Sequence, residues 1–148
     1  MIEQLMKELE IDEGRVNAVY TCSAGKPTFG VGHMILASDP EYGQPDGTPV
    51  SEDRVKEAFL ADLTNTIDDC RRLYPSFDEL PEEVCLILGN MMFNLGLPRL
   101  RGFKRLGIAI QGRSWDTAAT EMADSAWSRQ LPARSGRLIE RMRKVVDL

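Results

Sequence analysis

Residues 81–96 restrict the fold of this 148-residue chain more than any other segment, because they are apolar on almost every side of a helix. Between Val84 and Leu95 the polar side chains are those of Asn90 and Asn94. A helix that is apolar all round must be buried among other elements. The run of 12 residues is also much shorter than the ~20 apolar residues that cross a bilayer. We therefore expect a central buried helix in a globular domain, and no stable association with a membrane.

Helical periodicity continues on both sides of this segment. At the N-terminus one helix face carries Ile2, Leu5, Met6 and Leu9, and Gly14 provides a stop. A longer helix is expected from Ser51, a favourable N-cap, to Pro75, and its length of about 20 residues would link two lobes. Its apolar face consists of Val55, Phe59, Leu63, Ile67 and Cys70. Further helices are expected at 103–111, at 114–123 with Ser114 as N-cap, and at 134–146.

The segment between the first two helices favours strands and turns. Within residues 16–31, Val19-Tyr20 and Thr28-Phe29-Gly30-Val31-Gly32 flank a Ser23-Ala24-Gly25-Lys26-Pro27 turn, which predicts a small hairpin or meander. Residues 37–49 are rich in turn residues. The predicted class is α+β and mostly α. We expect a single domain over residues 1–148, with a small β-containing lobe at about 12–60 and a helical lobe formed by 1–11 and 75–148.

Charge is divided unevenly along the chain. The net charge of −5 and the pI near 5.0 argue against a protein that binds nucleic acid. Residues 1–98 carry 7 Lys+Arg and 18 Asp+Glu, whereas residues 99–148 carry 11 and 5. The C-terminal third is therefore a candidate cationic surface, with a group of arginines at Arg129, Arg134, Arg137, Arg141 and Arg143.

The cysteines and the single histidine exclude several kinds of site. Cys22, Cys70 and Cys85 are an odd number at wide spacings, which is not a disulfide framework, and the latter two lie on apolar helix faces. Because His33 is the only imidazole, we expect no metal and no cofactor. The N-terminal segment has neither a basic nor an apolar signal region, so no signal peptide is expected.

The segment from Glu13 to His33 contains the groups best suited to catalysis. Glu13 precedes Gly14 at the expected end of a helix, where the helix carbonyls disfavour negative charge and so favour the protonated carboxyl that a general acid needs. Cys22 and Thr28 follow within 15 residues. Taken alone, a Glu before a Gly at a helix end is also common in proteins without activity.

The segment from residue 11 to residue 33 resembles the catalytic segment of phage-type lysozymes, the T-even phage endolysin type. The matching residues are Ile11-Asp12-Glu13-Gly14, then Tyr20, then Thr28-Phe29-Gly30-Val31-Gly32-His33. The resemblance covers essentially the whole chain. It continues at Asn90-Met91-Met92-Phe93-Asn94-Leu95-Gly96, Gly102-Phe103, Trp115-Asp116, and Trp127 with Gln130, Pro132 and Arg134. It implies a lysozyme-like two-lobed fold, with a small N-terminal β-hairpin lobe, a long linking helix and a C-terminal helical lobe.

The resemblance also implies a reaction and its residues. Glu13 would be the general acid that protonates the glycosidic oxygen between N-acetylmuramic acid and N-acetylglucosamine in bacterial peptidoglycan. Arg134 would pair with Glu13, and Thr28 would position the water or the sugar. His33 would pair with Asp62 in a structural role. The sugar-contacting positions of the family fall on Met34, Phe93, Leu106 and Glu121.

The chain departs from the best-known members of the family at Cys22, where they carry Asp. A free thiol is mostly protonated at neutral pH. Its thiolate would attack the anomeric carbon, with retention of configuration, or act as base for a water, with inversion. A disulfide or a sulfenic acid at Cys22 would block both roles. The sequence leaves these alternatives open.

Three functional classes follow. The first is an endolysin that waits as a monomer in the host cytoplasm until a holin-type lesion releases it to the cell wall. The second is a non-catalytic wall-binding or virion-associated module. The third is a transglycosylase that forms an anhydro-sugar without water. Retention of Glu13, Thr28 and Arg134 favours the first class, because a binding module has little need for an acid at a helix end.

Overall fold

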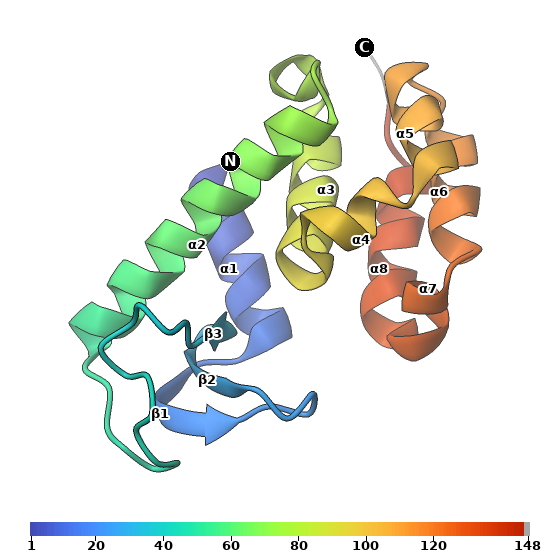
Figure 1. Ribbon diagram of the computed structural model, residues 1–148. Coiled ribbons are helices and arrows are strands. Elements are labelled where there is room, and N and C mark those ends of the chain that lie inside the picture. The colour runs from blue at the N-terminus through green and yellow to red at the C-terminus, as the bar shows by residue number, and fades with distance from the viewer. Residues whose placement is uncertain (147–148) are drawn as a thin grey trace. The chain divides into compact units, whose positions relative to one another are not determined.

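The computed structural model describes residues 1–146, and its elements follow the expected order, with several short elements that the sequence pattern did not predict (Figure 1). The described residues are mostly helical with a small antiparallel sheet, which confirms the α+β class. The elements are α1 (Ile2–Glu13), β1 (Val16–Thr21), β2 (Pro27–Gly30), β3 (His33–Met34), α2 (Glu52–Leu73), the 3-10 helix η1 (Phe77–Glu79), α3 (Glu82–Leu95), α4 (Leu97–Arg101), α5 (Lys104–Gln111), α6 (Trp115–Ala123), α7 (Ala126–Gln130) and α8 (Pro132–Arg143).

Two compact units make up the chain. The N-terminal unit is Met6–Asn65, and the helical unit is Met1–Leu5 together with Thr66–Leu148. Helices α1 and α2 each contribute residues to both units. No helix within residues 1–146 is long and apolar enough to cross a membrane.

The N-terminal unit contains a three-stranded sheet in the order β1-β2-β3, with both pairs antiparallel. Thr28 on the central strand pairs with Tyr20 on β1 and with Met34 on β3, so the two predicted site residues Thr28 and Met34 share one row of the sheet with Tyr20. A single apolar cluster joins the sheet and the following loop to the start of α2. It consists of Val19, Phe29, Ile35, Val50, Val55 and Ala58.

The helical unit is organised around α3, as the apolar run predicts. Ten of its residues are buried, and it contacts α4 and α8, while α6 and α8 lie side by side (Figure 1). Gly89 allows the start of the chain to lie close to α3, because a Cβ there would be 2.9 Å from Cδ2 of Leu5. The N-terminal amino group of Met1 also pairs with Glu82 at 3.2 Å.

Helix boundaries agree with the sequence except near the C-terminus. Ser51 caps α2 as expected, since its Oγ accepts a hydrogen bond from the backbone N–H of Arg54 at 3.1 Å. Ser114 precedes α6, but its hydroxyl donates to Oγ1 of Thr117 at 2.9 Å and does not cap the backbone. The prediction of a helix at 134–146 is wrong at both ends. Pro132, which suits the first turn of a helix, lies at the start of α8, and the helix ends at Arg143.

Candidate active site

Glu13 is the last residue of α1, and its carboxyl group lies against the turn that joins β2 to β3. A Cβ at Gly32 would be 3.0 Å from Oε1 of Glu13 and 3.4 Å from its Cβ. Gly32 has a φ of +63°, so a glycine suits both its conformation and the space. Helix α1 stops at Gly14, which has a φ of +77° and donates its N–H to the carbonyl of Glu10 at 2.9 Å. The half-buried Glu13 side chain is therefore held at the edge of the sheet.

Cys22 directly follows β1 and begins the tight turn that leads into β2. Its N–H donates to the carbonyl of Lys26 at 2.9 Å, and its own carbonyl accepts from the N–H of Gly25 at 2.8 Å. The thiol is half-buried and is a free thiol. Backbone hydrogen bonds from Lys26 and then from Ala24, with a further one from the Thr28 hydroxyl, outweigh partial burial and lower the pKa of Cys22 below its usual range. The turn thus favours the thiolate.

Thr28 lies beside this thiol and is almost completely enclosed, with 2% of its surface exposed. Its hydroxyl donates to the carbonyl of Lys26 at 2.9 Å and is also within hydrogen-bonding reach of Cys22. Tyr20 lies near both Cys22 and Glu13. Burial raises the pKa of its phenol, and the negative charges of Cys22 and Glu13 raise it further. The N-terminal unit therefore places Glu13 and Cys22 near Tyr20, which pairs with Thr28 on the neighbouring strand.

His33 is held between two carboxylates, as the resemblance implies for one of them. Its Nδ1 lies 2.7 Å from Oδ2 of Asp62 on α2, and its Nε2 lies 2.8 Å from Oδ2 of Asp39 in the loop after β3. Burial opposes the charged imidazole, but the hydrogen bonds to Asp62 and Asp39 outweigh burial and raise the pKa of His33. The imidazole also packs on Phe29, with ring centroids 4.9 Å apart. These contacts support a structural role for His33.

Arg54 extends this network, although nothing in the sequence analysis predicted it. Its guanidinium donates to Asp39 at 3.1 Å and to both oxygens of the buried Glu41 at 3.0 Å, and lies 5.4 Å from the centroid of the Phe29 ring. Hydrogen bonds from Arg54 lower the pKa of Glu41. Met34, by contrast, is 56% exposed on β3, where an apolar sugar face can contact it.

In the helical unit, the two asparagines that interrupt the apolar run of α3 hold other helices. Oδ1 of Asn90, which is 1% exposed, accepts a hydrogen bond from Nε of Arg134 on α8 at 2.9 Å. Oδ1 of Asn94 accepts from Nε1 of Trp127 on α7 at 2.8 Å. Phe93 lies between these asparagines in the sequence and is half-buried. The sequence could have indicated that Asn90 and Asn94 hold other helices, because polar residues within a buried apolar run are usually hydrogen-bonded.

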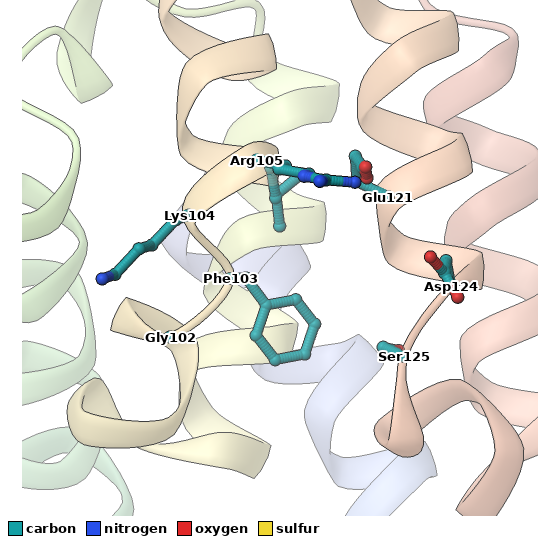
Figure 2. A pocket seen from close by; sticks show the side chains of 8 residues that line it. Gly102, Phe103, Lys104, Arg105, Glu121, Asp124 and Ser125 are labelled. Carbon is teal, nitrogen blue, oxygen red and sulfur yellow. The ribbon is translucent and has the colours of Figure 1, made fainter.

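Leu106 and Glu121, which are 15 residues apart, line the same cavity of about 400 Å³ between α5 and α6 (Figure 2). Arg105 and Glu121 point toward one another across it, from α5 and α6 respectively (Figure 2). Leu106 is only 1% exposed, so it contributes to the wall of the cavity and offers little surface to a ligand. The remaining lining residues are Gly102, Phe103, Lys104, Asp124 and Ser125.

The predicted residues are thus divided between the units. Those of the N-terminal unit are Glu13, Cys22, Thr28, His33, Met34 and Asp62, and those of the helical unit are Phe93, Leu106, Glu121 and Arg134. Within residues 1–146, no group of His, Cys, Asp and Glu side chains has an arrangement that would hold a metal ion.

Comparison with known proteins finds similarity along most of the chain. A family model described as phage lysozyme matches residues 10–144. Probable T4-type lysozyme 2 of Dictyostelium discoideum is 26% identical, covering 94% of this chain and 93% of that protein. Pre-baseplate central spike protein Gp5 of Enterobacteria phage T4 is 25% identical, covering 88% of this chain and 26% of that protein. Peptidoglycan hydrolase gp36 of Pseudomonas phage phiKMV is 26% identical, covering 78% and 12% respectively.

Proposed function

The chain belongs to the phage lysozyme family, and from this premise we propose that it is an endolysin that hydrolyses the β-1,4 bond between N-acetylmuramic acid and N-acetylglucosamine. That it is a glycoside hydrolase acting on peptidoglycan follows from the family and from its lysozyme and peptidoglycan hydrolase relatives. The proposal adds the bond, the residues and the biological role. By its resemblance to endolysins, the enzyme acts as a monomer in host lysis after a holin-type lesion releases it from the host cytoplasm.

The observation that carries the proposal is the grouping of Glu13, Cys22 and Thr28 around Tyr20 on the small sheet. A carboxyl group against the Gly32 turn and a thiolate-favouring turn at Cys22 give an acid and a nucleophile or base in the same locality. Glycoside hydrolysis requires this pair of functions, one group to protonate the leaving oxygen and one to act at the anomeric carbon.

In the first step, Glu13 donates its proton to the glycosidic oxygen as the bond to the anomeric carbon breaks. If Cys22 is the nucleophile, its Sγ forms a bond to the anomeric carbon, and a water then displaces the sulfur while giving its proton to the Glu13 carboxylate. If Cys22 is the base, it takes the proton of a water that attacks directly. Retention of configuration identifies the nucleophile and inversion identifies the base.

Other residues would orient the acid and the polymer. By resemblance to the family we assign to Arg134 the pairing with Glu13. Within the helical unit, Nε of Arg134 donates to Oδ1 of Asn90. Met34 and Phe93 would provide apolar surface for sugar faces, and Glu121 would accept hydrogen bonds from sugar hydroxyls or amides at the cavity between α5 and α6.

The test is mass spectrometry of the products released from purified peptidoglycan under reducing conditions. We expect wild type to release muropeptides with reducing ends, and Glu13→Gln to lower the rate by at least about 10³-fold, because the leaving oxygen is no longer protonated. Glu3→Gln is the matched control, since Glu3 is an exposed acid at the other end of α1. Both variants should unfold at temperatures close to that of wild type.

Other products would change the conclusion. Anhydro ends would identify a transglycosylase and contradict hydrolysis. Absence of products from wild type would contradict the proposed reaction altogether. Cys22→Asp should retain activity, because it restores the carboxylate usual in the family. Cys22→Ala should lose activity. Full activity of Cys22→Ala would show that the thiol has only a structural role.

A further inference from the structure

A basic cluster formed by Arg99, Arg101, Lys104 and Arg105 lies on α4 and the start of α5. All four side chains are exposed, and none forms an ion pair with a described residue. Some other cations of the helical unit are neutralised by neighbours, whereas Arg129 and Arg143 are exposed and also form no ion pair with a described residue. Arg141 makes a two-point contact with Glu83, at 2.7 and 3.0 Å, and Lys144 pairs with Glu140 at 2.9 Å.

The basic cluster is not explained by the stability of its own helices. Residues 84–115 contain no Asp or Glu, so these cations have no acidic neighbour in sequence. Lys104 and Arg105 lie in the first turn of α5, where the helix dipole disfavours positive charge, and Phe103 offers no side-chain cap. Like charges this close together repel one another, which favours a bound anion.

The cluster also lies next to the cavity to which we assign a sugar. Lys104 and Arg105 line that cavity, and Arg101 and Lys104 line a second one of about 540 Å³ formed mainly by apolar residues such as Leu73, Pro75 and Ile108. Figure 2 shows Arg105 directed at Glu121 and Lys104 directed away from it. A polymer held at the first cavity can therefore extend across the cluster towards the second.

We propose that the basic cluster binds the carboxylates of the stem peptides of peptidoglycan, which deepens the proposed function and rests on it. Stem peptides branch from the glycan and carry several free carboxylates along a backbone that rises about 3.3 Å per residue. The four cations fall within seven consecutive residues, on α4 and at the start of α5, so several carboxylates of one peptide can bind to them together. Arginine is well suited to this role because its planar fork binds carboxylates at two points.

Binding of inactive protein to purified cell wall tests the proposal without requiring catalysis. All proteins carry Glu13→Gln, and the test variant adds Arg99→Gln and Arg101→Gln, because neither residue lines the sugar cavity. The ligands are intact sacculi and glycan strands from which an amidase has removed the peptides. At low salt we expect about fivefold weaker binding to intact sacculi. Binding to peptide-free glycan should be unchanged.

The control removes equal charge elsewhere, with Lys7→Gln and Lys56→Gln, two exposed cations without an ion pair among the described residues. Equal loss in test and control variants would mean that only net charge matters and would overturn the proposal. Equal loss on both ligands would also overturn it. Unchanged binding to sacculi, with loss of binding to vesicles containing phosphatidylglycerol, would identify a membrane-binding surface in its place.

Failure of this proposal is distinguishable from failure of the proposed function. If wild type releases muropeptides but the test variant binds sacculi normally, only the peptide-binding role is wrong. If wild type releases no product, the function fails whatever the binding assay shows.

Discussion

The three thiols of this chain have different environments, and only the thiol of Cys22 has a lowered pKa. Cys22 receives hydrogen bonds from the backbone of Lys26 and Ala24, which lower its pKa. Burial raises the pKa of Cys70 to about 12 and that of Cys85 to about 11. Since the thiolate is the reactive species, reactivity is confined to the candidate active site.

We predict that iodoacetamide at pH 7 under reducing conditions modifies Cys22 selectively and abolishes activity in proportion to labelling. A lowered pKa means that the thiolate of Cys22 forms at lower pH than an ordinary thiolate. The labelling rate should therefore rise with pH, and the midpoint of this rise should lie below the pKa of an ordinary thiol. Peptide mapping by mass spectrometry identifies the modified residue, and Cys22→Ala is the control that should take up no label. The prediction would be contradicted if Cys85 were labelled faster than Cys22, or if the midpoint of the pH dependence equalled the pKa of an ordinary thiol.

At the residue scale, candidate site residues could be proposed from the sequence, but their environments could not. The Glu-Gly end of α1 and the Gly25-Lys26-Pro27 turn are evident in the sequence. The lowered pKa of Cys22 depends on the direction in which the amides of that turn point, and the sequence does not determine this direction. Leu106 illustrates the reverse case, because it falls at a family position for sugar contact and yet is 1% exposed.

At the scale of elements, long helices were predictable and short ones were not. Apolar periodicity identifies α2 and α3, but α4 and α7 contain five residues each, which is little more than one turn. Strand β3 has only two residues, and it is defined by pairing with β2. Two of these short elements hold residues to which we assign a role: Met34 lies on β3, and the basic cluster begins on α4.

The network around His33 joins β3, the following loop and α2. Only the contact with Asp62 was implied by the resemblance, whereas Asp39 and Arg54 came from loop and helix positions with no shared motif. Because the imidazole contacts two carboxylates, its charged form is the one that the folded state favours.

We predict that His33→Gln destabilises the protein more at pH 5 than at pH 9. A raised pKa in the folded state contributes stability below the unfolded value of about 6.5, and this contribution is lost as pH rises through the folded value. The loss at pH 5 should be about 1.5–3 kcal/mol in the free energy of unfolding, the usual range for hydrogen bonds to charged groups. Urea unfolding at both pH values measures it. An equal loss at both would show that the charge of His33 is unimportant.

At the scale of the whole molecule, the net charge of −5 conceals a local positive surface. The sequence indicates an excess of cations after residue 98, and the structure shows which of them are already paired. Arg141 and Lys144 are neutralised by Glu83 and Glu140, while the basic cluster forms no ion pair with a described residue, although Arg105 points toward Glu121 (Figure 2). Attraction to an anionic wall should therefore involve few charges, namely the basic cluster on α4 and α5 and the exposed Arg129 and Arg143.

We predict that the rate of wall hydrolysis falls with added salt, but less steeply than for a strongly basic lysozyme measured on the same sacculi. Salt screens exposed charges over ~10 Å at 0.1 M, so the few exposed cations of the helical unit, with the basic cluster foremost, contribute to the slope, while the remaining acidic surface opposes binding at low salt. Release of dye from labelled sacculi at increasing NaCl concentrations measures the slope. Arg99→Gln with Arg101→Gln should flatten it further, whereas Lys7→Gln with Lys56→Gln should leave it nearly unchanged. A decline as steep as that of the basic enzyme would show that attraction to the wall involves far more of the surface than this cluster.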